Sequence, residues 1–384
     1  MNLVVPDKLA GPLGRIAARA ERYVRQCTAL EVGPGRVAIL ADHRLLPLSW
    51  TRDAYYQALL LLVAPAKSTP RRPGAEIVAD HLRWLWLECV RPGGGWARSH
   101  HADGRRKDER FQADQQLYPL LELCDYATAV GQLPTLGAGD EAAERGAWSR
   151  LVAAVLAMLD RSSGQDGMLA SEENAADDEA GLPYQLSTQI LAWYTFRRLA
   201  GLGGLLELSD DFAERAEKHQ QTVARHFTTD YLGRPTWAYA SDGRGRRLFY
   251  HDANDLPTAL APVWGFCAPG DPAWRATMDL AFSPHNDAYV AGQFGGLGSR
   301  HTRGTWSLGL IQEWVARSLA GEPTGAADAL RRLVAVALDD WMLPEASDPT
   351  TGRLAARPWF AWPGAAVGAL SAVHLGEVWP SVSG

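Results

Sequence analysis

Apolar residues recur at three- and four-residue intervals along most of the chain, which is the spacing of amphipathic α-helices. Only short stretches, such as residues 36–41 and 246–251, have the alternation of a strand. The chain is therefore expected to be all-α, with about twelve helices. These helices are predicted over residues 9–27, 51–64, 75–90, 113–130, 147–161, 186–202, 209–227, 256–266, 271–282, 305–321, 327–343 and 363–379.

Long polar or glycine-rich loops alternate with short helix connections. The long loops cover residues 91–111, 162–184, 240–255 and 283–304. Helical hairpins that close into a ring place their long loops at one end, where binding sites concentrate. The alternation predicts an (α/α)6 barrel, with an open α-solenoid as the alternative, although no fixed-period repeat supports a solenoid. The length suits one barrel domain spanning residues 1–384.

Composition narrows the class of partner. The formal net charge is −6 and the arginines are scattered, so nucleic acid is not expected to bind. The chain has no apolar run of membrane-spanning length and no secretory-type start, so we expect a cytoplasmic protein that does not enter membranes. The four cysteines lie far apart and are expected to be buried thiols. We expect a monomer or small homo-oligomer that binds a small molecule.

Tryptophan is unusually abundant, with 15 residues, and its flat ring commonly lines sugar or apolar-ligand sites, although most single tryptophans simply pack. Trp50, Arg52 and Asp53 stand together at the start of a predicted helix. Asp53 alone could be a helix cap. Together, an apolar surface, a forked donor and an acceptor suit a ring that carries hydroxyl groups.

The loop "SEENAADDEAGLPY" carries an acidic cluster that includes Asp177 and Asp178, and it ends with Tyr184 at the next helix. It could be a solvated acidic loop. Alternatively, crowded carboxylates raise the pKa of one member, which then stays protonated and can donate to a leaving oxygen.

Three further segments gather polar side chains near predicted helix starts. Asp252, Asn254 and Asp255 precede one helix, where they could form turn hydrogen bonds or hold a ligand. Asp114 lies in the first turn of another helix and shares a face with Tyr118. The glycine-rich segment "GGLGSRHTRGTW" contributes Arg300, His301 and Trp306, which suit direct hydrogen bonding to a polar ligand.

Motifs of other enzyme classes do not occur in the sequence. It has no nucleophile elbow, zinc-protease pair, dinucleotide fingerprint or complete P-loop, and its His/Asp spacings match none of the strong metal motifs. No metal and no cofactor is therefore expected.

In their order along the chain, these segments resemble the metal-independent exo-α-mannosidases of glycoside hydrolase family 125, and more loosely the bacterial glucoamylase-like hydrolases. "WTRDAYYQ" resembles the family's Trp-x-Arg-Asp helix start, and "FQADQQLYPL" resembles its Glu-Leu-Asp-x-x-x-Tyr-Pro segment with Asp114 kept. "AADDEAGLPYQLSTQ" is similar to its Ser-Asp-Asp loop. "DANDLPT" and "GLGSRHT" resemble its Asp-Ala-Asn-x-Pro-Ser and Gly-Ile-Gly-Ser-Pro-His-Thr segments.

The resemblance implies an (α/α)6 barrel that cleaves an α-linked glycoside with inversion and without a metal. One acid of the Asp177/Asp178 pair would protonate the leaving oxygen, and a second carboxylate would activate water. The family's second carboxylate lies in a Phe-Ala-Trp segment that ends in Gly-Glu. The corresponding segment here, "FAWPGAAVGAL", contains Trp362 and has Ala369 at the glutamate position.

Loss of a general base costs about 10²- to 10⁴-fold in rate, so this departure leaves three alternatives open. Asp252, Asp255 or Glu313 could activate water instead. Phosphate, held by Arg300 and Arg303, could replace water in a phosphorylase. The barrel could also have been repurposed for acid-catalysed cyclisation or isomerisation of a natural product. A sugar-binding protein without turnover is a further class.

Overall fold

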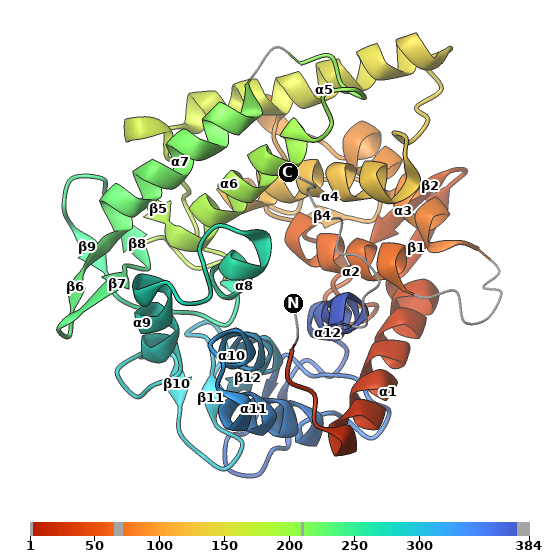
Figure 1. The fold of residues 1–384 in the computed structure, drawn as a ribbon. Coiled ribbons are helices and arrows are strands. Elements are labelled where there is room, and N and C mark those ends of the chain that lie inside the picture. The colour runs from red at the N-terminus through yellow and green to blue at the C-terminus, as the bar shows by residue number, and fades with distance from the viewer. Residues whose placement is uncertain (1–2, 65–71, 209–210, 375–384) are drawn as a thin grey trace.

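The computed structural model describes residues 3–64, 72–208 and 211–374. Twelve α-helices lie within these ranges (Figure 1). The even-numbered helices are α2 (Thr51–Val63), α4 (Ala113–Val130), α6 (Leu186–Ala200), α8 (Leu256–Trp264), α10 (Ser307–Leu319) and α12 (Ala361–His374). The odd-numbered helices are α1 (Asp7–Tyr23), α3 (Gly74–Arg83), α5 (Glu141–Ser162), α7 (Phe212–Phe227), α9 (Pro272–Ala281) and α11 (Pro323–Ala335).

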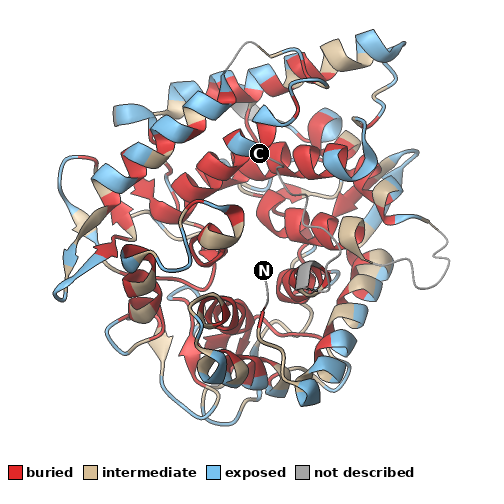
Figure 2. Cartoon of the chain, viewed as in Figure 1, coloured by how far each residue is buried: buried red, intermediate tan, exposed pale blue. Residues whose placement is uncertain are grey.

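The even-numbered helices form a closed inner ring. Each packs against the next in the order α2, α4, α6, α8, α10 and α12, and α12 packs back on α2. Their side chains are buried nearly all round, and Figure 2 shows them as the buried centre of the molecule. The fold is therefore an (α/α)6 barrel, as predicted.

The odd-numbered helices lie outside this ring and bury one face each. In α1 the buried positions are Leu13, Ile16, Ala20 and Tyr23, which repeat at intervals of three and four residues. This is the periodicity on which the sequence prediction depended. α1 packs on α12, α7 on α6 and α11 on α10.

Small antiparallel sheets connect the helices at the end of the barrel where the inner helices begin. β3, β5 and β12 lead directly into α2, α6 and α10. The predicted strand over residues 36–41 is confirmed as β2, and β9 lies within residues 246–251. The sheets are β1–β2 (Ala29–Gly33, Arg36–Ile39), β3–β4 (Leu48–Ser49, His100–His101), β5–β8–β9 (Tyr184–Gln185, Ala240–Ser241, Arg247–Leu248), β6–β7 (Thr228–Tyr231, Arg234–Trp237), β10–β11 (Tyr289–Val290, Gly296–Leu297) and β12–β13–β14 (Thr305–Trp306, Ala346–Ser347, Leu354–Ala356).

Helix boundaries differ from the predictions where local chemistry sets them. α5 begins earlier than predicted because Asp140 caps it, with its side chain accepting from the Ala143 amide at 2.9 Å. α11 begins at Pro323, which suits a first helical position because proline has no amide to leave unpaired. The end of the predicted helix 363–379 lies outside the described residues.

Within the described ranges, no helix combines the length and the apolar character that crossing a membrane requires. All four cysteines are free thiols; Cys89 and Cys124 are buried, whereas Cys27 and Cys267 are partly exposed.

The inner ring tolerates no side chain at Gly309 in α10. A Cβ built there would overlap the backbone carbonyl of Leu297, which precedes β12. Gly14 in the outer helix α1 is exposed and has open space around it. We expect Gly309→Ala to lower the free energy of unfolding by about 2–3 kcal/mol. The matched change Gly14→Ala should raise it by about 0.5–1 kcal/mol, because alanine favours the helix.

Urea unfolding of both variants measures these changes. A neutral Gly309→Ala variant would contradict the packing described for α10.

Candidate active site

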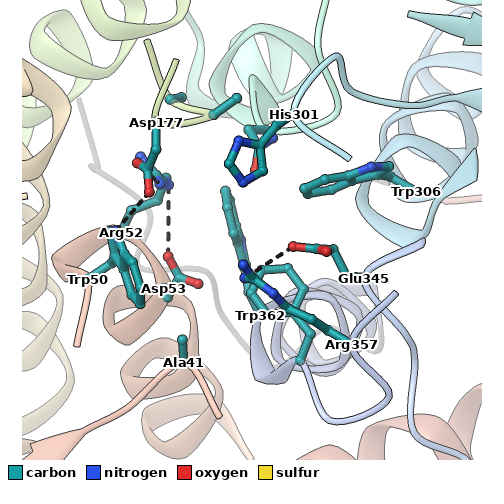
Figure 3. Close-up of a pocket in the computed structure, with 14 residues that line it drawn as sticks. Ala41, Trp50, Arg52, Asp53, Asp177, His301, Trp306, Glu345, Arg357 and Trp362 are labelled. Carbon is teal, nitrogen blue, oxygen red and sulfur yellow. Dashed lines mark hydrogen bonds and ion pairs between the residues drawn. The ribbon is translucent and has the colours of Figure 1, made fainter. Parts of the chain in front are cut away.

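The amino-terminal ends of the inner helices converge on one pocket. Trp50 and Trp306 are the residues immediately before α2 and α10, and Trp362 lies in the first turn of α12. The pocket opens to solvent. The positive ends of several helix dipoles therefore face it, which favours negative charge there. Its lining residues are Ala41, Trp50, Arg52, Asp53, Ala175, Ala176, Asp177, Asn254, His301, Trp306, Glu345, Arg357, Phe360 and Trp362 (Figure 3).

Arg52 is the buried cation of this pocket. Its Nη1 donates to Asp114 Oδ2 at 2.8 Å, and its Nη2 donates to Asp177 Oδ1 at 3.3 Å. Its Nε lies 3.9 Å from Asp53 Oδ2, and the guanidinium lies 5.4 Å from the centre of the Trp362 ring. Three carboxylates thus surround one guanidinium, so Arg52 is held charged and in one position.

Asp177 is fixed by its backbone and by both carboxylate oxygens. Its φ of 63° lies in the left-handed region, which is strained for a residue other than glycine. Trp50 Nε1 donates to Oδ2 at 3.0 Å, and Gln112 Nε2 donates to Oδ1 at 2.7 Å. The acidic loop therefore presents this carboxylate to the pocket in a defined orientation.

Asp53 lies beside Arg52 and is almost fully buried. Burial, together with the charge of the nearby Asp177 and against the lowering effect of Arg52, raises its pKa from 3.8 to about 7. Asp53 is therefore partly protonated near neutral pH, so that it can both donate and accept hydrogen bonds.

A second acidic centre faces this group across the pocket. Figure 3 shows Glu345 and Arg357 on the side of Trp306, opposite Asp177 and Arg52, with Trp362 between the two sides. Arg357 Nη1 lies 3.2 Å from Glu345 Oε1. Burial raises the pKa of Glu345, whereas Arg357 and His301 lower it. Like Asp177, Arg357 has a left-handed backbone, with φ of 40°.

Half of the predicted polar site residues lie behind or beside the pocket instead of in its wall. Asp114 supports Arg52 from behind. Asp252 accepts from Asn254, Tyr250 and Ser299, and so positions the pocket residue Asn254. Asp255 precedes α8 and bonds to the Ser187 hydroxyl; burial, together with the charge of Asp252, raises its pKa to about 8.

Asp178, Tyr184 and Arg300 also lie outside the pocket wall. Asp178 Oδ1 lies 3.4 Å from Nδ1 of the pocket residue His301, and its side chain is 40% exposed. Tyr184 is buried in β5. Arg300 pairs with Asp287 and stacks over the Tyr250 ring, so its guanidinium is already engaged. Arg303 is exposed and does not line the pocket either.

Position 369 does not border the pocket. Ala369 is 1% exposed and belongs to the main hydrophobic core. It follows Trp362 by seven residues in α12, which places it about 10 Å further along the helix axis, away from the pocket end. The alanine at position 369 therefore removes no carboxylate from the pocket wall, to which Glu345 belongs.

Sequence reasoning missed Glu345, Arg357 and Gln112. Glu345 is a single acid in the loop before β13, and nothing in its spacing distinguishes it from surface glutamates. The sequence signal that could have pointed to Glu345 is the Asp-Pro-Thr-Thr-Gly turn that follows it, because this turn brings the chain back toward Arg357 and Trp362. Glu313, proposed as a substitute base, pairs with Arg332 at 2.9 Å and does not line the pocket.

Among residues 3–64, 72–208 and 211–374, no group of three or more histidine, cysteine or acidic side chains is arranged to hold a metal ion. The pocket instead offers hydrogen-bond donors and acceptors beside aromatic rings, which is the composition of a polyhydroxylated-ligand site.

An (α/α)6 barrel with opposed carboxylates in an aromatic pocket defines the class of glycoside hydrolase-like enzymes. A sequence model of the metal-independent α-mannosidases, glycoside hydrolase family 125, matches residues 155–371, which is more than half of the chain. The chain belongs to this family.

Solved structures share the fold. A metal-independent α-mannosidase of Streptococcus pneumoniae, in a non-productive complex with α-1,6-mannobiose, has a TM-score of 0.78 over 95% of each chain at 18% identity. A bacterial glucoamylase in complex with acarbose has a TM-score of 0.68 at 14% identity, covering 97% of this chain and 57% of its own. At these identities the likeness concerns the fold alone.

A similar protein of known sequence is the Meiotically up-regulated gene 157 protein of Schizosaccharomyces pombe. It is 30% identical over 154 residues, which are 38% of this chain. The match spans 29% of the length of the fission-yeast protein.

The raised pKa of Asp53 makes stability depend on pH. In the unfolded chain Asp53 loses its proton near 3.8, whereas in the folded protein it keeps the proton to about 7. Between these values the folded state binds more protons, so stability falls as pH rises, at up to about 1.4 kcal/mol per pH unit. Above pH 7 this contribution is constant.

Asp53→Asn should remove this slope. Urea unfolding at several pH values between 4 and 8 compares the two proteins, and equal slopes would show that Asp53 titrates as an ordinary aspartate.

Proposed function

We propose that the protein hydrolyses α-linked mannosides at chain ends with inversion, using Asp177 as the general acid and Glu345 as the general base. The observation that carries the proposal is the placement of these two carboxylates on opposite sides of one aromatic pocket (Figure 3). Membership of the metal-independent α-mannosidase family supports the substrate class.

Each step uses residues of the pocket. The terminal sugar lies against the ring of Trp362, and its hydroxyl groups bond to Arg52, Asp53 and Asn254. Asp177 gives its proton to the glycosidic oxygen as the bond from that oxygen to the anomeric carbon breaks. A water molecule attacks the opposite face of the anomeric carbon, and its proton passes to Glu345. The first product is then the β-anomer.

Asp177 is preferred to Asp178 as the acid because Asp177 lines the pocket, whereas Asp178 lies beside it on His301. We further propose that residues 1–384 act as one catalytic domain on a small glycoside.

A time course of proton NMR spectra with α-1,6-mannobiose, with and without phosphate, tests the proposal. We expect β-mannose to appear first and phosphate to have no effect. Asp177→Asn should lower kcat about 10²- to 10⁴-fold with the fold intact, and Asp178→Asn should lower it much less.

Phosphate-dependent release of mannosyl phosphate would instead identify a phosphorylase. No turnover of any mannoside would favour a natural-product cyclase or isomerase, or a sugar-binding protein without activity. Full activity of Asp177→Asn would refute the assignment of the acid.

The base predicts the acidic limb of the pH profile. Glu345 must be ionised to accept a proton, and burial raises its pKa above the ordinary 4.5. The pKa of Glu345 therefore lies above 4.5, and kcat/KM should fall as the pH is lowered through this pKa. Arg357→Gln removes a charge that lowers this pKa, and should move the limb upward by about one pH unit or more.

Arg353→Gln is the matched control, because Arg353 is exposed on the same hairpin and does not line the pocket. An acidic limb that moves equally in both variants, or in neither, would remove Glu345 from the base role.

A further inference from the structure

We infer that Gln112, at the start of α4, is a positioning residue that determines which oxygen of Asp177 carries the catalytic proton and that keeps a further negative charge away from this carboxyl group. This inference rests on the proposed function, because it concerns the acid step of that reaction. Gln112 is fully buried and does not line the pocket, so it acts through Asp177.

The orientation of the Gln112 amide is set by its neighbours. Its Oε1 accepts from Gln115 Nε2 at 3.1 Å and from Arg52 Nη1 at 3.4 Å. Its Nε2 therefore faces the acidic loop, where it donates to Asp177 Oδ1 at 2.7 Å and to Glu173 Oε2 at 3.1 Å. The reversed amide would place its NH₂ group against two donors, so only one orientation satisfies all four partners.

This amide leaves one oxygen of Asp177 for the proton. Oδ1 accepts from both Gln112 and Arg52, which occupies its two lone pairs. Oδ2 accepts from Trp50 Nε1 and keeps one lone pair. The transferable proton therefore resides on Oδ2. In the acid step the Oδ2–H bond breaks, the proton bonds to the glycosidic oxygen, and the electron pair of the bond to the anomeric carbon moves to that oxygen.

The neutral amide also keeps a negative charge away from the acid. A carboxylate here would face Asp177 and Glu173 together, and like charges at this separation favour the protonated form of a neighbour. The neutral amide of Gln112 therefore adds no negative charge beside Asp177.

Two variants separate charge from orientation. Gln112→Glu keeps the size, removes the same donor as Gln112→Met and adds a charge, so we expect it to slow hydrolysis and also to move the basic limb of kcat/KM upward by about one to three pH units. Gln112→Met keeps the size and removes the donor. Misplacing the acid should then slow hydrolysis of α-1,6-mannobiose about 10²-fold.

The leaving group provides a readout that a packing defect does not alter. The dinitrophenolate of a dinitrophenyl α-mannoside leaves without a proton, so Gln112→Met and Asp177→Asn should both hydrolyse this substrate at nearly the wild-type rate. Gln116→Met is the matched control. Gln116 is also buried in α4 but bonds to the backbone of Trp96 and Gln112. It should lose stability without any dependence on the leaving group.

Equal slowing of both substrates by Gln112→Met, or an unmoved basic limb in Gln112→Glu, would overturn the inference while Asp177→Asn still confirms the acid. A wild-type protein that cleaves no mannoside, or an Asp177→Asn variant that hydrolyses α-1,6-mannobiose at the wild-type rate, would instead overturn the proposed function itself. If Gln112→Glu fails to fold, the leaving-group comparison with Gln112→Met decides the question alone.

Discussion

The site depends on one buried guanidinium. Arg52 contacts three carboxylates, those of Asp53, Asp114 and Asp177, in a region with little access to water. Without a positive charge at this point, desolvation and mutual repulsion would force protons onto these acids. One cation does not balance three anions, and the proton that Asp53 holds near neutral pH reduces the remaining excess. Arg52, on the inner helix α2, thus holds Asp53, Asp114 and Asp177 together by charge.

The barrel explains how residues so far apart in sequence reach the pocket. Each inner helix starts at the same end of the ring, so the first turns of these helices lie near the pocket or behind its wall whatever their position in the chain. The loops have the opposite role, since they hold conformations that a helix does not allow. Asp177 and Arg357 both adopt left-handed backbones in such loops and face each other across the pocket. Helix starts therefore provide aromatic and charged side chains of the pocket, and loops with left-handed residues provide the side chains of Asp177 and Arg357.

The sequence predicted the barrel well because outer helices have one buried face and clear periodicity, as in α1. It predicted Trp50, Arg52, Asp53 and Asp177 because unusual residue types cluster at a helix start or loop. The sequence did not show which polar residues line the pocket and which support those that do. Asn254 lines the pocket, whereas Asp252, two residues away, lies behind it. Glu345 escaped notice because a single loop glutamate carries no spacing signal. Ala369 was overvalued because a linear motif does not show how far along α12 a position lies.

The closure of the ring by α12 has a consequence for biosynthesis. α12 packs on α1 and α2, and it supplies Trp362 to the pocket, so the first and last helices of the ring complete the site together. Contacts of such large sequence separation form late and slowly. A nascent chain emerging from the ribosome therefore holds Arg52 and its acids in an unfinished ring, with apolar helix surface exposed until the final helix docks. The pocket is therefore complete only when α12 has closed the ring, and shielding of the open ring during translation becomes a natural task for chaperones.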